Sequence, residues 1–168
     1  AVSLDKPVSE LCDGIDSVAL CLSKALACPV GSLLMGSSDF IKKATRMRQR
    51  LGGGWRQAGV LAAAGIVAFE EMIGRLGEDH ENARQLAQFL KELGLGIDME
   101  QVQSNIIFID TEPLNVSAVR LSSELANLNI KVKVIGEYAL RAILHKDIAT
   151  SDLETVRTAF NHVIKILK

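Results

Sequence analysis

The chain has 168 residues, 48% of them hydrophobic, and its 19 basic and 20 acidic side chains nearly cancel in charge. This hydrophobic content excludes a disordered chain, and the balanced charge indicates neither nucleic acid nor an anionic membrane as a partner. Three cysteines without paired spacing predict reduced thiols, which fits an intracellular protein of the cytoplasm or the mitochondrion. The most apolar run, residues 58–69, is too short to cross a bilayer.

The first part of the chain predicts two strands followed by two helices. Apolar runs bounded by turn-forming residues indicate strands at 17–22 and 32–35. Ser38 is a suitable cap for a helix with a basic face at 38–51, which three consecutive glycines then break. The next helix is expected from residue 55 to about residue 73, and its apolar composition requires cover on most sides.

From residue 78 onward the pattern changes to that of a small α/β layer. We expect helices and strands in the order helix, strand, helix, strand, strand, helix, at residues 78–93, 104–110, 116–128, 130–135, 138–145 and from Ser151 to the end. The change in pattern places a domain boundary near residues 74–77. The fold class is therefore α/β, with one domain at 1–76 and a second at 77–168.

Lys24 follows the first predicted strand, in the segment SVALCLSKALACPVGS. Lysine amines in water are protonated at neutral pH, and an amine becomes a nucleophile only when its surroundings favour the neutral form. Apolar strand residues on one side and small residues on the other could desolvate this amine. Taken alone, the Ser-Lys pair fits a surface lysine at a strand end better than a reactive one.

Gly52, Gly53 and Gly54 precede Arg56 in the segment RLGGGWRQAGV. Backbone amides in a glycine-rich turn before a helix can bind an anion such as phosphate, and Arg56 adds positive charge. The spacing is not that of a Walker loop, and the turn follows no strand. The alternative is a flexible turn between two helices.

Arg141 lies in the otherwise apolar strand segment ALRAILHKDI, and His145 follows four residues later. A guanidinium binds a carboxylate through two parallel hydrogen bonds, so the segment is a candidate anion site. The alternative is an edge-strand arginine that faces water. No spacing of Cys, His and Asp indicates a metal site.

These segments, in this order, resemble the threonine aldolase family of pyridoxal-phosphate enzymes. CLSKALACPVGS resembles the family pattern LSKGLGAPVGS, and LGGGWRQAG resembles LGGGMRQAG almost letter for letter. LRAILHKDI resembles RxVTHxDV, and SNIIFID resembles the family's strand that begins with Thr-Asn. The match covers essentially the whole chain.

The resemblance implies a fold-type-I pyridoxal-phosphate lyase that cleaves threonine or allo-threonine to glycine and acetaldehyde. Residues 1–76 would be the end of the large cofactor domain, with Lys24 as the Schiff-base lysine, and residues 77–168 the small C-terminal domain. Gly52, Gly53, Gly54 and Arg56 would lie near the cofactor phosphate, often that of a neighbouring subunit, and Arg141 would hold the substrate carboxylate. The partners implied are a small amino-acid substrate and further copies of the chain, which form tetramers in the family.

The chain also departs from the family pattern. Ala25 and Ala27 replace two glycines after the lysine, and Gln49 replaces a lysine before the glycine run. The family's aspartate that pairs with the pyridine nitrogen lies further upstream than the 23 residues that precede Lys24. We therefore expect a C-terminal part with little or no activity by itself. The alternatives are a truncated or degenerate non-catalytic copy, or another fold-type-I lyase or transaminase.

Overall fold

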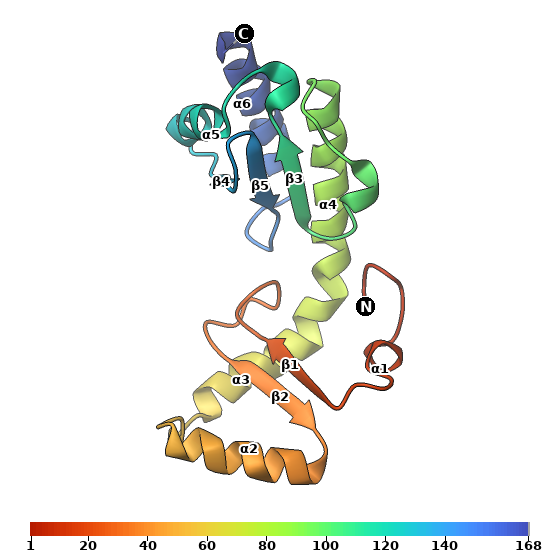
Figure 1. Cartoon of the computed structure of the whole chain (residues 1–168), viewed down its shortest axis with the longest axis vertical. Helices are drawn as coiled ribbons and strands as arrows, with labels where there is room; N and C mark the ends of the chain where they lie inside the picture. Colours follow the sequence, from red (N-terminus) through yellow and green to blue (C-terminus); the bar gives the residue numbers. More distant parts are fainter. Residues whose placement is uncertain (168) are drawn as a thin grey trace. The chain divides into compact units, whose positions relative to one another are not determined.

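A computed structural model describes residues 1–167, and the chain divides into two compact units, Ala1–Leu76 (unit 1) and Gly77–Lys168 (unit 2). The division falls where the change in sequence pattern places the domain boundary. Figure 1 shows the elements of each unit. Among the described residues, no helix is both long enough and apolar enough to cross a membrane.

Unit 1 contains a two-stranded antiparallel sheet and mainly helical segments around it. Its elements are α1 (Val8–Leu11), β1 (Ser17–Cys21), β2 (Ser32–Gly36), α2 (Ser38–Arg50), α3 (Gly59–Val67), the π-helical η1 (Ala68–Met72) and the first turn of α4 (Ile73–Glu92). Both predicted strands and the basic helix are confirmed. The cap of α2 is Ser37 rather than Ser38, because the Ser37 hydroxyl accepts the amide of Phe40 at 3.3 Å.

The second predicted helix begins at Gly59 instead of residue 55. Residues 56–58 form a turn, with Gln57 in the left-handed region at φ +52°. The helical run then continues through η1 into α4 without a break. The buried core of unit 1 is small and consists of Leu22, Leu26, Cys28 and Ala68.

Unit 2 has a three-stranded antiparallel sheet in the order β3-β5-β4. Its further elements are η2 (Met99–Gln101), β3 (Ile106–Asp110), η3 (Glu112–Leu114), α5 (Ala118–Asn127), β4 (Lys133–Val134), β5 (Ala139–Ile143) and α6 (Asp152–Leu167). The predicted order of helices and strands is confirmed. The strand expected at 130–135 is only two residues long, and it ends at a turn in which the amides of Ile135 and Gly136 both donate to the Ala139 carbonyl.

The core of unit 2 covers one face of this sheet. Alternate strand residues point to it, among them Ile107, Ile109 and Leu140, all at most 1% exposed. The helices α4, α5 and α6 contribute apolar stripes such as Leu90, Leu125 and Phe160 to the same cluster. The opposite face of the sheet carries Phe108 and Arg141 and is not part of this core.

Candidate functional site

Lys24 lies in a tight turn directly after β1. The amide of Ala27 donates to the Lys24 carbonyl at 2.8 Å, and the neighbouring Leu22 donates to Gly31 at 3.0 Å. Leu22 and Leu26 are buried on either side, whereas the Lys24 side chain is exposed. The backbone of the turn is therefore held by hydrogen bonds and by two apolar anchors, while the amine stays accessible.

Small residues allow this turn to pack against α3. The Cys28 thiol donates to the carbonyl of Ala64 at 3.4 Å. At Gly65, a Cβ atom would lie 3.4 Å from the Leu22 side chain, at ordinary van der Waals distance, so the loop and α3 are in contact there. The sequence-based expectation that apolar neighbours desolvate Lys24 is not met within unit 1. The apolar neighbours Leu22 and Leu26 are buried, whereas the Lys24 side chain is exposed to solvent.

Cys21 is a chemically distinctive residue that the sequence analysis did not single out. Its Sγ lies 3.4 Å from the Ser23 hydroxyl oxygen. Hydrogen bonds to the side chain and backbone of Ser23 lower the pKa of the Cys21 thiol, and the Lys24 ammonium lowers it further. The signal available in the sequence was the spacing Cys-x-Ser-Lys at the end of a strand.

The triple glycine ends α2 instead of starting the next helix. The Gly53 amide donates to the Arg48 carbonyl at 2.8 Å, and the Gly52 amide, at φ +80°, donates to Gln49 at 3.1 Å. This pair of bonds is a Schellman motif, which satisfies carbonyl groups at a helix C-terminus. The sequence-based reason for placing a phosphate here is therefore wrong for the amides of Gly52 and Gly53, because both already donate to the helix.

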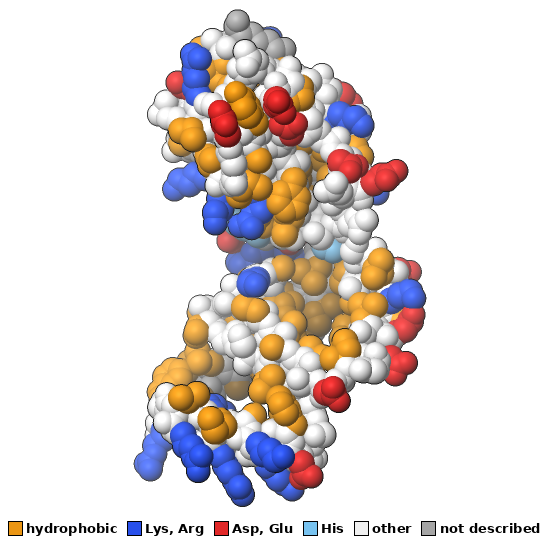
Figure 2. Space-filling view, in the orientation of Figure 1, with side chains coloured by type: hydrophobic (Ala, Val, Ile, Leu, Met, Phe, Trp, Pro, Cys, Tyr) orange, Lys and Arg blue, Asp and Glu red, His pale blue; other side chains and the backbone are white. Residues whose placement is uncertain are grey.

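Positive charge near the glycine turn comes from side chains. Arg56 is exposed in the turn that follows the glycines. In addition, α2 exposes five basic side chains and one acidic one, so Figure 2 shows blue side chains gathered along this helix; they are Lys42, Lys43, Arg46, Arg48 and Arg50. An anion at this turn would have to bind to guanidinium and ammonium groups.

Arg141 occupies the centre of β5, directly opposite Phe108 on β3 and Lys133 on β4. Its neighbours Leu140 and Ala142 face the core, so Arg141 belongs to the opposite face of the sheet. The side chain is half-buried, and its Nε atom is fully buried without a hydrogen-bond partner in the described residues. An unsatisfied buried donor of this kind is costly, and an anionic ligand at this face would bind to the terminal guanidinium nitrogens.

The end of β5 is fixed by Asn105, the asparagine of the SNIIFID segment. Its side-chain amide donates to the Leu144 carbonyl at 2.7 Å, and the Leu144 amide donates back to the Asn105 carbonyl at 2.9 Å. His145 lies beyond the end of β5, so the alternation of the strand does not place it on the same face as Arg141. Its Nδ1 is 3.6 Å from a carboxylate oxygen of Asp147. Within the described residues, no group of three or more His, Cys, Asp or Glu side chains could hold a metal ion.

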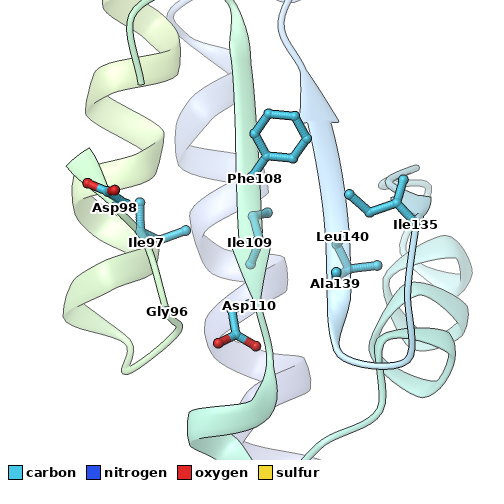
Figure 3. Close-up of a pocket in the computed structure, with 9 residues that line it drawn as sticks. All are labelled: Gly96, Ile97, Asp98, Phe108, Ile109, Asp110, Ile135, Ala139 and Leu140. Carbon is cyan, nitrogen blue, oxygen red and sulfur yellow. The ribbon is translucent and has the colours of Figure 1, made fainter. Parts of the chain in front are cut away.

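A shallow hollow lies on the open face of the sheet (Figure 3). Phe108, which lines this hollow, lies opposite Arg141 in the strand ladder. Phe108 stands between β3 and β5, and Ile135 lies on the far side of β5, both in front of the sheet in this view. Asp110 and Asp98 also line the hollow. Each carboxylate accepts a hydrogen bond from the backbone amide two residues later, Glu112 and Glu100 respectively. The hollow is therefore mainly apolar, and its two carboxylates already accept hydrogen bonds from nearby backbone amides.

The predicted residues are divided between the two units. Lys24, the three glycines and Arg56 belong to unit 1, and Arg141 belongs to unit 2. Unit 1 thus holds an accessible amine and a basic turn, and unit 2 holds a half-buried guanidinium beside an apolar hollow. These groups can respectively bind an aldehyde, a phosphate and a carboxylate.

Most of this chain is similar in sequence to curated threonine aldolases. It is 37% identical over 166 residues to low-specificity L-threonine aldolase 1 of Arabidopsis thaliana, covering 98% of this chain and 46% of the relative. It is 39% identical over 151 residues to the low specificity L-threonine aldolase of Escherichia coli K12, covering 90% of this chain and 43% of the relative. The chain therefore spans about half the length of the curated relatives it matches.

Solved structures and a family model agree with these relatives. A crystal structure from Listeria monocytogenes, assigned as an L-allo-threonine aldolase, matches with a TM-score of 0.79 at 22% identity. The match covers 96% of this chain and 48% of that one, which shows the same α/β fold over about half of its length. The family model described as beta-eliminating lyase matches residues 1–112, two thirds of the chain. The chain belongs to the beta-eliminating lyase family.

Proposed function

We propose that this chain is part of a pyridoxal-phosphate-dependent lyase that cleaves β-hydroxy amino acids, with threonine or allo-threonine giving glycine and acetaldehyde. The family and the names of the relatives support the reaction class. The observation that carries the proposal is the turn at Lys24, where a hydrogen-bonded backbone and the buried Leu22 and Leu26 present an accessible amine directly after β1.

The residues present fit part of the cofactor. The exposed amine of Lys24 suits its aldehyde, and Arg56 beside the basic α2 suits its phosphate. The amides of Gly52 and Gly53 do not fit a phosphate, because they already donate to carbonyl groups of α2. When bound, pyridoxal phosphate supplies an electron-withdrawing ring that takes up the electron pair released at the substrate Cα.

In this proposal, residues of the chain bind the cofactor and orient the substrate. The amine of Lys24 would hold the cofactor through its aldehyde, and when free it would accept or return a proton close to the substrate. The half-buried guanidinium of Arg141 binds the substrate carboxylate. Fixing this carboxylate decides which bond at Cα is aligned for cleavage, and that is the positioning role of Arg141.

The first test is reduction of the full chain with borohydride after incubation with pyridoxal phosphate. We expect stable labelling concentrated on Lys24, identified by peptide mapping, and loss of that label in Lys24→Arg. Lys43→Arg is the matched control, because Lys43 is an exposed lysine on α2. Equal labelling of Lys24 and the other exposed lysines would contradict the proposal.

A second measurement addresses the activity of this chain alone. We expect its production of glycine and acetaldehyde to be far below that of a complete relative, because the chain spans less than half of the relatives' length. Turnover similar to that of the Escherichia coli relative, assayed in parallel, would refute this expectation. A non-catalytic copy is the second candidate, favoured by Ala25 and Ala27 in place of the two glycines of the related pattern, and it predicts no selective labelling.

A further inference from the structure

The two cations Lys133 and Arg141 lie directly opposite each other in the β4-β5 ladder. Opposite residues of antiparallel strands point to the same face of a sheet, with Cβ atoms about 4.5–5.5 Å apart. Since Leu140 and Ala142 face the core, both cations belong to the open face. Phe108, which is 51% exposed, lies opposite Arg141 on the other neighbouring strand, β3.

This arrangement is electrostatically unfavourable as it stands. Like charges directly opposite each other in a sheet destabilise it. Within the described part of the chain, neither Lys133 nor Arg141 forms an ion pair, and Arg141 Nε is buried without a hydrogen bond. Asp110 shares this face, but it lies opposite Ala139, and one of its oxygens accepts the Glu112 amide at 2.9 Å. A bound anion would offset the repulsion between the two cations.

We propose that Lys133 and Arg141 bind one carboxylate together, with Lys133 as an additional substrate-positioning residue. The planar guanidinium takes both carboxylate oxygens, and the ammonium donates to a remaining lone pair of the same group. Phe108 and Ile135, which line the adjacent hollow, accommodate the hydrocarbon part of the ligand (Figure 3). The inference rests on the proposed function only in taking this carboxylate to be that of the amino-acid substrate.

The test measures acetate binding to the full chain without any cofactor. Thermal unfolding at increasing acetate, with chloride keeping the ionic strength constant, gives the dissociation constant from the rise in Tm. We expect Lys133→Gln to raise the acetate dissociation constant by about five-fold, and Arg141→Lys to raise it further. Lys165→Gln, which removes an exposed lysine from α6 on the core side of the sheet, should leave it unchanged.

The same variants separate ligand binding from a structural role. Without acetate, Lys133→Gln should have a Tm equal to or above that of the parent chain, because it relieves the repulsion. A lower Tm, or unchanged acetate binding, would overturn the proposal. The proposal would also be overturned if Lys133→Gln bound succinate, a dicarboxylate, more weakly but bound acetate as the parent chain does. That result would assign Lys133 to a second carboxylate. Failure of Lys24 labelling would leave this result intact, because no measurement here involves the cofactor.

Discussion

The amide of Ala27 donates a 2.8 Å hydrogen bond to the carbonyl of Lys24, and Ala27 adopts a left-handed conformation at φ +58° to make it. For a residue with a Cβ atom this conformation costs roughly 1–2 kcal/mol. The related pattern LSKGLGAPVGS has glycine at this position, where the conformation is free of that cost. This chain therefore retains the turn at Lys24 despite a local strain.

Ala27→Gly should stabilise the chain. Relief of the left-handed strain outweighs the added flexibility of the unfolded chain, leaving a gain of about 0.5–1 kcal/mol in the free energy of unfolding. Urea denaturation followed by circular dichroism measures it. Ala25→Gly is the matched control, since Ala25 is not among the residues with positive φ, and it should be neutral or destabilising. A loss of stability in Ala27→Gly would show that the turn is not strained.

Gly53→Ala should destabilise the end of α2. A Cβ at this position would lie 2.8 Å from the Arg48 Cγ and 3.1 Å from the Arg48 carbonyl oxygen, the group to which Gly53 donates. We expect a loss of about 1–3 kcal/mol in the free energy of unfolding, without any ligand present. Gly54→Ala is the control, because its nearest contact, the Gln49 Cγ at 3.4 Å, is at ordinary range and is a flexible side chain. Equal stabilities would argue against the helix-ending role.

The order of elements was predictable because alternation and capping are local properties. β5 follows from the alternation around Arg141, and the buried stripe of α4, including Ala83 and Leu90, follows from its helical period. The start of α3 at Gly59 was missed because no residue in WRQA is a strong helix breaker, although Gln57 takes a left-handed conformation. The π-helical turn η1 has no sequence signal that we can identify.

The candidate site residues were chosen from the sequence and remain a prediction, but their local geometry could not be predicted from it. The sequence located Lys24 and Arg141 through their segments, but burial of Lys24 depends on which neighbours turn inward, and Leu22 and Leu26 do so without covering it. The glycine run was misread because a turn before one helix is also the end of another. The pairing of Lys133 with Arg141 depends on strand register, which a two-residue strand does not reveal.

Cys21 should react with iodoacetamide at lower pH than an ordinary cysteine. The Ser23 hydrogen bonds and the Lys24 ammonium lower the pKa of its thiol, so a larger fraction is thiolate at a given pH. Ser23→Ala should shift the pH profile of alkylation upward, and Lys24→Gln should shift it less. Cys12, which is also partly exposed, is the internal control in the same sample. A Cys21 profile that does not move in Ser23→Ala would exclude this mechanism.

Unit 1 should make the chain self-associate. Of the described large hydrophobic residues that are exposed, 18 lie in unit 1 and six in unit 2, and every residue of β2 is exposed although its sequence is SLLMG. Burying such a surface between copies is favourable. We expect sedimentation velocity to show concentration-dependent association that weakens when Leu33 and Met35, on one face of β2, are both replaced by threonine. Val119→Thr, at a position 63% exposed on α5, is the control and should associate like the parent chain. A monomer at every concentration would mean that this surface is tolerated in water.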